Sequence, residues 1–375
     1  MYHLARNLQA RGIETVLFTR TPTRSEPFPG EVVAVPYGGT RESHGRILDR
    51  TLRYPRFSQR LGAAVAERVR AGQIDVVDAQ GLCALGYGRA RRAERALRAP
   101  LVMNPQGLEE HKAGGLKRLA LGRLRALSRE AARLADRVIA TDEANRDEVP
   151  ALLGVEPSRV SVIPNGIEPD EVRALTPRDP AAVVAEAWPA LRGASPVLLS
   201  AGRLEVYKGF GDVLEALARL HRRGGLPSAW AWVVAGEGPA RRGLQAKARA
   251  RLGGHAHFTG RVDDAMLHAL YARADVFVHA PRYEGSSLVT LEAMAHGLPV
   301  VATRAGGIPD KVADGVTGRL VAPGEADALA GSIAALAVDA ALRREMGRRG
   351  RARAEAEFAW SRIIERVVAL YESLL

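Results

Sequence analysis

Residues 278–287 read VHAPRYEGSS, and residues 288–295 continue as LVTLEAMA. The first part starts as an apolar strand, and the second part has the pattern of a helix. In the short loop between them, Gly285 permits close backbone approach and Ser286 or Ser287 can cap the helix. The exposed amides at such a helix N-terminus favour an anion, so the stretch predicts a diphosphate site in an α/β fold.

Two glutamates flank this loop: Glu284 precedes the helix and Glu292 lies within it. Gly297 and Pro299 then end the helix and lead into the next buried strand. By themselves, these residues predict a strand–loop–helix phosphate site with two hydrogen-bond acceptors nearby. An ordinary strand-to-helix turn with two solvated carboxylates fits them equally well, and the rest of the chain has to decide.

Strands and helices alternate along the whole chain, which indicates parallel sheets flanked by helices. A turn signal at 164–166 separates two α/β halves, and the predicted helices include Asp212–Arg222 and Ala265–Ala274. The predicted strands of the first half are Glu14–Thr19, Glu31–Val35, Ile74–Asp78, Leu101–Asn104, Arg137–Thr141 and Arg159–Ile163. Those of the second half are Val197–Ala201, Trp230–Ala235, His257–Thr259, Val276–Ala280, Val300–Thr303 and Arg319–Val321.

The length of 375 residues exceeds the usual size of one domain, so we expect two domains with separate cores. Hydrophobic residues make up 47% of the chain, and no apolar run of about 18 residues predicts a membrane span. No signal-peptide pattern opens the sequence. The single cysteine, Cys83, excludes an intramolecular disulfide and fits a reducing cytoplasm, where a buried structural thiol is its simplest interpretation.

The formal net charge is +12, from 54 Lys and Arg against 42 Asp and Glu. Such a balance points to anionic partners: nucleic acid, anionic lipid or phosphorylated substrates. The chain has no zinc-ligand pattern, no basic-zipper heptads and no RNA-binding sheet signature, so we expect no nucleic-acid partner. Nearly all the basic residues are arginine, which also fits a biased genome, so charge by itself does not decide the function.

Further short motifs surround residues 278–295 on both sides. They are Ile163-Pro164-Asn165-Gly166-Ile167, Gly202-Arg203-Leu204 with Lys208-Gly209, Gly236-Glu237-Gly238-Pro239, Phe258-x-Gly260-Arg261-Val262, Ala274-Asp275-Val276-Phe277-Val278, Glu284-x₇-Glu292, Gly297-Leu298-Pro299-Val300-Val301-Ala302-Thr303, Gly306-Gly307, Asp314-Gly315-x-Thr317-Gly318, Val321-x-Pro323-Gly324 and Phe358-x-Trp360. In this order they strongly resemble the motifs of glycosyltransferase family four. The Glu-x₇-Glu pattern alone is weakly specific, whereas the ordered set makes a chance similarity implausible.

The resemblance implies the GT-B fold, in which two Rossmann-like domains face each other across a central cleft. We therefore expect an acceptor-binding domain at 1–168 and a donor-binding domain at 169–357. The final helix, within 358–375, is expected to cross back to the first domain, as in relatives of this family.

The chain opens directly in an amphipathic helix, Tyr2–Arg11, which Gly12 ends. A doubly wound domain normally starts with a strand and a glycine-rich turn that lead into this helix. We therefore expect that the first strand of the N-terminal domain and its loop, roughly 10–15 residues, are missing. Either the start codon lies further upstream or the protein is truncated.

The resemblance assigns catalytic roles to Arg203, Lys208 and Glu284. Arg203 and Lys208 would bind the donor diphosphate. Breaking a glycosyl–phosphate bond builds negative charge on the leaving diphosphate, so fixed cations are useful there. The alternative is that Arg203 and Lys208 are surface residues at the start of a helix.

In such enzymes Glu292 accepts hydrogen bonds from the ribose hydroxyls, and Glu284 lies beside the anomeric carbon of the transferred sugar. A carboxylate there can bind sugar hydroxyls and stabilise an oxocarbenium-like centre without acting as a covalent nucleophile. Structural salt bridges are the alternative for both glutamates. The other donor-binding residues implied by the resemblance are Gly285, Ser286, Ser287 and Leu288, through backbone amides, and Arg261 and Val262, near the nucleobase.

The acceptor half matches the family less closely. Gln106 stands where many relatives carry a histidine, and it forms the acceptor-side set with Glu109 and His111. Gln106 cannot act as a base but can position a sugar hydroxyl, and a surface role is the alternative for His111. Residues 78–81 likewise replace a His-Ala-His-like segment. No Asp-x-Asp motif follows a strand, so we expect no metal and no cofactor beyond the nucleotide diphosphate sugar.

Residues 112–137 are strongly basic, with only Glu130 and Asp136 as acids, and leucines recur among them. One basic amphipathic helix is expected here, and such a helix can lie on anionic lipid. Some family members use this region in that way, which would place the protein at the inner face of the plasma membrane. The alternative is a solvated basic face whose leucines pack onto their own domain.

Three classes of function remain. The leading expectation is a retaining hexosyltransferase-like enzyme that moves a sugar by front-face displacement to a carbohydrate or lipid-linked acceptor in cell-envelope or exopolysaccharide synthesis. A GT-B epimerase or phosphorylase is the second, although the block at 284–292 and the spacing from Arg203 to Lys208 argue against it. A non-catalytic or truncated nucleotide-sugar-binding protein is the third.

Overall fold

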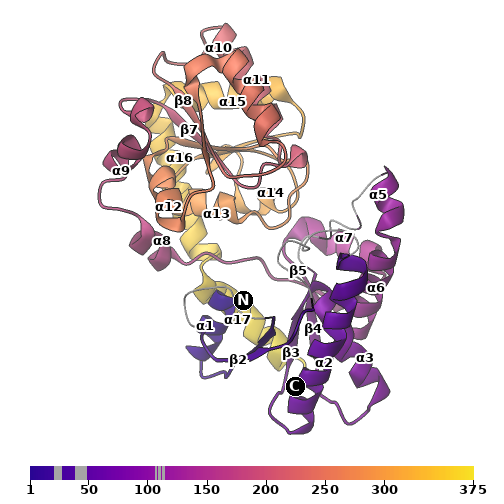
Figure 1. The fold of residues 1–375 in the computed structure, drawn as a ribbon. Coiled ribbons are helices and arrows are strands. Elements are labelled where there is room, and N and C mark those ends of the chain that lie inside the picture. The colour runs from indigo at the N-terminus through magenta and orange to yellow at the C-terminus, as the bar shows by residue number, and fades with distance from the viewer. Residues whose placement is uncertain (21–27, 39–48, 106–107, 109–110, 112–114) are drawn as a thin grey trace. The chain divides into compact units, whose positions relative to one another are not determined.

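The computed structural model describes residues 1–20, 28–38, 49–105, 108, 111 and 115–375. These residues form two compact units (Figure 1). Unit 1 consists of residues 1–164 together with Trp360–Leu375, and unit 2 consists of Asn165–Ala359.

Unit 2 is built around a six-stranded sheet in which every neighbouring pair is parallel, in the order β12-β11-β10-β7-β8-β9. Its strands are β7 (Val197–Ala201), β8 (Ala231–Ala235), β9 (Ala256–Gly260), β10 (Val276–His279), β11 (Val300–Thr303) and β12 (Gly318–Val321). Its helices are α8 (Pro169–Leu175), α9 (Pro180–Ala187), α10 (Phe210–Arg222), α11 (Arg241–Leu252), α12 (Asp264–Arg273), α13 (Leu288–Ala295), α14 (Ile308–Lys311), α15 (Ala326–Val338) and α16 (Ala340–Glu357).

Both faces of this sheet are buried, which explains why its strands read as continuous apolar runs. Leu198 and Val278 belong to a core that includes residues of α10, α11 and α15. Leu199 and Phe277, one residue away on the same strands, belong to a second core with residues of α12 and α13.

Aspartates at the N-caps begin several helices; Asp142, Asp179, Asp263 and Asp339 each accept a hydrogen bond from a backbone amide three residues on.

The strand order of unit 2 reverses at β7. The next strand along the chain, β8, lies on one side of β7, and β10 lies on the other. In open parallel sheets, ligands bind outside the carboxyl ends of the strands at such a switch point. The loops that follow β7 and β10 are therefore the first place to look for a site.

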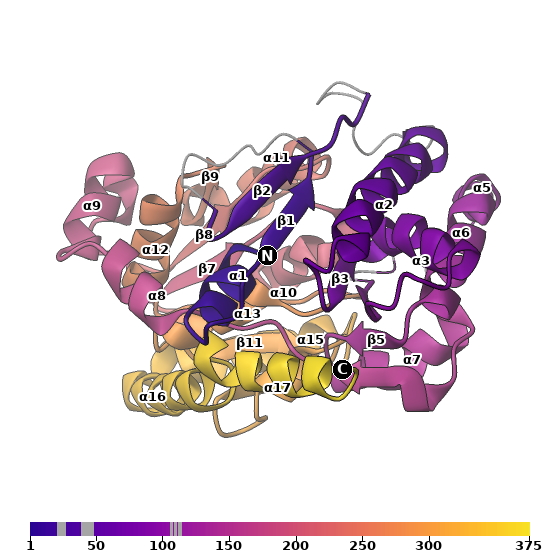
Figure 2. The ribbon, with the colours of Figure 1, turned by 90° about the horizontal axis from the view of Figure 1, so that it is seen from below.

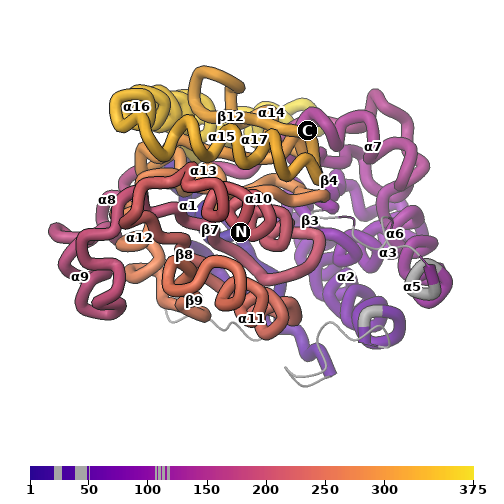
Figure 3. The backbone as a smooth tube through the Cα atoms, turned by 90° about the horizontal axis from the view of Figure 1, so that it is seen from above, coloured from indigo at the N-terminus to yellow at the C-terminus, as the bar shows by residue number. Residues whose placement is uncertain are grey.

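Unit 1 contains a parallel sheet in the order β3-β4-β5-β6 and a separate parallel pair, β1-β2. The strands are β1 (Val16–Thr19), β2 (Glu31–Ala34), β3 (Val77–Gln80), β4 (Leu101–Asn104), β5 (Arg137–Ala140) and β6 (Val160–Val162). The helices are α1 (Tyr2–Gln9), α2 (Tyr54–Arg70), α3 (Ala84–Ala93), α5 (Gly115–Ala120), α6 (Gly122–Leu134), α7 (Glu143–Leu153) and α17 (Trp360–Glu372). Figure 3 shows α2, α3 and α6 side by side.

The last helix, α17, lies beside α1 in unit 1 (Figure 2). Leu4 and Leu8 of α1 share a buried cluster with Ile363 and Val367 of α17 and with Val102 of β4. The Tyr371 hydroxyl of α17 donates a 2.7 Å hydrogen bond to Asp78 on β3. Helix α17 thus covers one face of the four-stranded sheet.

Each of the twelve predicted strands is present, but the prediction for β3 was shifted. Residues Ile74–Asp78 were expected to form it, whereas Val77–Gln80 do. Pairing with β4, from Val77 opposite Leu101 to Gln80 opposite Asn104, sets this register. Periodicity within one segment does not contain that information.

The single basic helix expected at 112–137 is also wrong, since the described part forms α5 and α6, separated at Leu121. Leu121 and Leu124 are buried in the core of unit 1, and Arg89 forms an ion pair with Glu130. Leu119 on α5 is 78% exposed. Most described leucines of this segment are therefore engaged with unit 1. Within the described ranges, no helix is long and apolar enough to cross a bilayer.

Candidate functional site

The loop between β7 and α10 carries Arg203 and Lys208, and its close approach to β10 depends on Gly209. Gly209 has φ +73°, and a Cβ atom there would lie 1.6 Å from the carbonyl oxygen of Ala280. Only glycine fits both constraints. The Arg282 amide also donates a 2.8 Å hydrogen bond to the Tyr207 carbonyl. These contacts bring Lys208 against the loop that follows β10.

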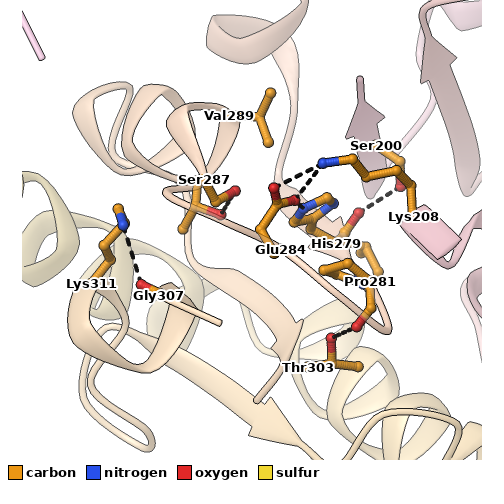
Figure 4. Close-up of polar contacts among 12 residues, drawn as sticks. Ser200, Lys208, His279, Pro281, Glu284, Ser287, Val289, Thr303, Gly307 and Lys311 are labelled. Carbon is orange, nitrogen blue, oxygen red and sulfur yellow. Dashed lines mark hydrogen bonds and ion pairs between the residues drawn. The ribbon is translucent and has the colours of Figure 1, made fainter. Parts of the chain in front are cut away.

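Glu284 lies at the centre of this region (Figure 4). Lys208 Nζ lies 2.8 and 2.9 Å from its two carboxylate oxygens, and His279 Nε2 lies 2.7 Å from Oε2. The Glu284 side chain is buried, and a Cβ at Gly306 would lie 1.7 Å from its backbone oxygen. The backbone and the carboxylate of Glu284 are thus both held in place.

The electrostatic environment keeps Glu284 ionised. Burial raises its pKa, but the hydrogen bond and charge of His279 and the charge and hydrogen bonds of Lys208 outweigh burial and lower the pKa to about 2. An ionised carboxylate only accepts hydrogen bonds, so His279 Nε2 carries the proton in this contact. Glu284 is therefore unsuited to act as a proton donor, because it stays a carboxylate at any physiological pH.

Tyr207 connects the two cations that follow β7. Arg203 is exposed, and its Nη2 donates a 3.0 Å hydrogen bond to the Tyr207 hydroxyl. The Lys208 ammonium lies 5.5 Å from the centre of the Tyr207 ring, within the range of a cation–π contact. Arg203, Tyr207 and Lys208 form one group at the carboxyl edge of the sheet.

The N-terminus of α13 follows directly after Glu284. Ser287 occupies the N-cap position, but its hydroxyl lies 2.8 Å from the Thr290 hydroxyl instead of accepting from a backbone amide. The expectation that a serine side chain caps this helix is therefore wrong for Ser287. The Ser286 hydroxyl is buried and has no hydrogen-bond partner among the residues that the structure describes.

Glu292 lies one helical turn further along α13 and is half-buried. The Tyr271 hydroxyl of α12 donates a 2.9 Å hydrogen bond to Glu292 Oε2. Burial raises the pKa of Glu292, the Tyr271 hydrogen bond lowers it and the charge of Asp264 raises it, with a net upward shift. His296 stacks on the Tyr271 ring, with centroids 5.4 Å apart, and its Nε2 lies 2.8 Å from Nδ1 of His268.

The remaining predicted donor residues lie on unit 2. Arg261 is exposed and Val262 half-buried, directly after β9. Leu288 is 44% exposed at the first position of α13. A Cβ at Gly285 would meet no heavy atom of the described chain within 4 Å. The structure thus brings Lys208, Glu284 and the start of α13 together, while Arg261 and Val262 belong to the loop after the edge strand.

The acceptor-side predictions are mostly outside the described residues. Gln106 and Glu109 lie there, and His111 is half-buried. Asp78 is a neighbouring feature that sequence reasoning noted without a role. Burial raises its pKa, although hydrogen bonds from Tyr371 and Gln80 lower it. The described contacts of Asp78 anchor α17 to β3.

Sequence reasoning missed three residues that hold the predicted ones: Tyr207, Tyr271 and His279. His279 carried a usable signal, because a histidine ends an otherwise apolar strand five residues before Glu284. Tyr207 stands between the two predicted cations, which was a weaker signal. Tyr271 gave none, since its contact with Glu292 depends on how α12 packs against α13.

Two protein-family models match the chain. The model described as Glycosyltransferase Family 4 matches residues 1–171, and the model described as Glycosyl transferases group 1 matches residues 188–353. The first match ends just after unit 1 passes into unit 2, and the second lies inside unit 2.

Curated relatives match with similar identity but different coverage. D-inositol 3-phosphate glycosyltransferase of Actinosynnema mirum is 31% identical over 395 residues, which cover 96% of this chain and 88% of that protein. Glycogen synthase of Mycobacterium tuberculosis is 31% identical over 278 residues, which cover 72% of this chain. That match spans 63% of the glycogen synthase, so the chain covers less than two thirds of this relative's length.

Solved structures of similar fold cover nearly the whole chain. Sucrose-phosphate synthase from Thermosynechococcus elongatus has a TM-score of 0.77 at 24% identity, over 99% of this chain and 91% of that one. Anabaena HepE, solved in complex with UDP and glucose, has a TM-score of 0.75 at 20% identity, over 99% of this chain and 96% of that one. These likenesses confirm the expected α/β fold with two Rossmann-like units.

Proposed function

The chain belongs to glycosyltransferase family four, the glycosyl transferases group 1, with the GT-B fold, and on this premise we propose that it is a retaining enzyme that uses a nucleotide diphosphate sugar. The sugar passes to a carbohydrate or lipid-linked acceptor. The observation that carries the proposal is the group of Lys208, Glu284 and the α13 N-terminus at the switch point of unit 2.

This group has the chemistry that a glycosyl diphosphate requires. Lys208 and Arg203 supply positive charge, and the exposed amides that begin α13 favour an anion. The open space at Gly285 lets a phosphate approach the backbone, and the buried Ser286 hydroxyl is a donor that a phosphate oxygen would satisfy. Arg261 and Val262 would face the nucleobase, and Glu292 would accept from the ribose hydroxyls.

In the proposed step, the bond between the anomeric carbon and the phosphate oxygen breaks, and its electron pair leaves with the nucleoside diphosphate. The acceptor oxygen bonds to the anomeric carbon on the same face, and its proton passes to the departing phosphate oxygen. Lys208 and Arg203 stabilise the charge that develops on the leaving group, and a single contact of this kind is worth ~10²–10³ in turnover.

We assign Glu284 an electrostatic role beside the anomeric carbon. Both of its oxygens accept hydrogen bonds from Lys208 or His279, and its low pKa keeps it negative. A fixed negative charge stabilises an oxocarbenium-like centre, whereas a carboxylate held by two donors is a poor covalent nucleophile.

The named relatives suggest which donors to try first. HepE was solved with UDP-glucose, and other relatives are named as glycogen synthase and D-inositol 3-phosphate glycosyltransferase. We therefore propose a nucleoside-diphosphate hexose as donor. With two cations and a helix N-terminus for the diphosphate, we also propose that turnover needs no divalent metal.

We assign acceptor binding to unit 1, where Gln106, Glu109 and His111 stay the candidates, and a cleft between the units stays a prediction. We also propose that the protein contacts the cytoplasmic face of an anionic membrane through its basic segment. Leu119 and Arg123 are exposed residues of the described part of this segment. Sedimentation with phosphatidylglycerol vesicles tests this contact. If the wild type and Leu119→Glu bind the vesicles equally well, Leu119 takes no part in this membrane contact.

The experiment is donor binding and turnover with a panel of UDP-, ADP- and GDP-hexoses, by isothermal titration and by release of nucleoside diphosphate. We expect saturable binding to one donor class that Lys208→Ala or Arg203→Ala abolishes, and turnover that a chelator leaves unchanged. Binding without turnover for every acceptor tried would favour a non-catalytic nucleotide-sugar-binding protein. No binding at all would refute the donor site.

A further inference from the structure

His279 is a buried titratable residue that the motifs do not include, and it contacts the carboxylate at the centre of the site. It ends β10, is 3% exposed, and its Nε2 lies 2.7 Å from Glu284 Oε2 (Figure 4). Its ring is 6.0 Å from that of Phe277 on the same strand. A buried imidazole at hydrogen-bonding distance from a buried carboxylate is a specific arrangement, because both polar groups would otherwise be costly to bury.

Glu284 therefore has two different donors. One is Lys208, whose ammonium has three N–H groups, of which two serve the carboxylate oxygens. The other is His279, which is held by the strand and contacts Oε2 from a different element. The Lys208 side chain is 21% exposed, whereas the His279 side chain is 3% exposed.

The proposed donor brings two phosphates to this point, and they compete with Glu284 for the same ammonium. If Lys208 were the sole partner of Glu284, its turn toward the diphosphate would leave a buried, unpaired carboxylate beside a second anion. Removing one partner from a buried ion pair is strongly unfavourable. A second donor that stays in place reduces this penalty.

We propose, on the basis of the proposed function, that His279 is a positioning residue for donor turnover. Its Nε2–H holds Glu284 as a fixed carboxylate while Lys208 turns from Glu284 to the donor diphosphate. The same contact sets the orientation of Glu284 toward the anomeric carbon.

The charges around Glu284 make the proposal specific. His279 on β10 and Lys208 before α10 are the groups whose charge and hydrogen bonds lower the pKa of Glu284, while burial raises it. Arg282, two residues before Glu284, forms an ion pair with Asp212 of α10. Removing the His279 contact therefore moves the pKa of Glu284 upward from about 2, so protonation of Glu284 begins to lower the rate at a higher pH than in the wild type.

The test uses the full chain with His279→Gln, His279→Leu and His221→Gln. Glutamine keeps an N–H donor at a similar distance from Glu284, whereas leucine removes the donor. His221 is an exposed histidine at the end of α10, so His221→Gln serves as the matched control. For each protein, kcat and KM for UDP-glucose, ADP-glucose and GDP-mannose are measured from pH 5 to 8. The Tm of each variant checks that it folds.

We expect His279→Leu to lower kcat about 10–100-fold with little change in KM, and to lose a larger share of its kcat than the wild type does as the pH falls from 7 to 5. His279→Gln should recover most of kcat near pH 7, and His221→Gln should match the wild type. A folded His279→Leu variant with wild-type kcat and the same pH dependence of kcat as the wild type would overturn the positioning role alone. Absence of turnover by the wild type with every donor would instead overturn the proposed function, and this inference with it.

Discussion

The Tyr207 hydroxyl accepts a 3.0 Å hydrogen bond from Arg203, so this aromatic side chain helps to orient an exposed guanidinium that also lies 3.9 Å from the Glu205 carboxylate. The same ring faces the Lys208 ammonium at 5.5 Å. Arg203 and Lys208 thus share a neighbour that can order both before any donor arrives. Preorganised cations stabilise a developing charge better than mobile ones do.

Tyr207→Phe is expected to weaken donor binding about 3–10-fold, because it removes the hydroxyl that holds Arg203 but keeps the ring beside Lys208. Tyr207→Ala removes both contacts and should weaken binding further. Isothermal titration with UDP, ADP and GDP measures the difference. Val206→Ala is the matched control, since Val206 precedes Tyr207 and is 82% exposed. Equal affinities of Tyr207→Ala and Val206→Ala would contradict this role of Tyr207.

The fold was predictable from the sequence because the strands of unit 2 are buried on both faces. Leu198 and Leu199 point into different cores, yet both are apolar, so the strand reads as one continuous hydrophobic run. The start of β3 was not predictable in the same way. Its register depends on pairing with β4, and β3 and β4 lie far apart in the sequence.

The residues of the site were predicted as separate positions, and their contacts were not. The motifs identified Lys208 and Glu284 but did not indicate that the two side chains form an ion pair. That contact depends on how the loop that contains Gly209 packs against Ala280. The Ser287 hydroxyl could have capped α13 but contacts Thr290 instead, and two local hydrogen bonds of similar strength cannot be ranked from sequence.

Gly209→Ala tests the packing that brings Lys208 to Glu284. The new Cβ would lie 1.6 Å from the Ala280 carbonyl oxygen, at a residue with φ +73°. The loop has to move, so we expect a loss of at least about 1–2 kcal/mol in the free energy of unfolding and loss of donor binding. Gly211→Ala is the control, because its Cβ would meet open space on α10. That variant should be as stable as the wild type or up to about 1 kcal/mol more stable. A Gly209→Ala variant that binds donor with wild-type affinity would contradict the packing argument.

Tyr271→Phe tests the support of Glu292. The Tyr271 hydrogen bond lowers the pKa of Glu292 against burial and Asp264, so its loss raises that pKa further. A larger fraction of Glu292 is then protonated as the pH falls, and a protonated carboxyl accepts ribose hydroxyls less well. We expect the Kd for UDP to rise about 3–10-fold, more at pH 6 than at pH 8. The comparison ligand is 2′,3′-dideoxy-UDP, which lacks both ribose hydroxyls. An equal loss of affinity for both ligands would contradict the assignment of Glu292 to the ribose.

His296 makes the stability of the protein depend on pH. Burial, with smaller effects from His268 and Arg351, lowers its pKa from 6.5 to about 3. Between these values the unfolded chain binds a proton that the native state does not, so native stability falls as the pH drops below 6.5. Urea unfolding at pH 7.5 and pH 5 should show the wild type losing about 1–2 kcal/mol more than His296→Gln over this interval. His221→Gln should behave like the wild type. If His296→Gln and the wild type lose the same stability between the two pH values, the imidazole of His296 is not held neutral in the native state.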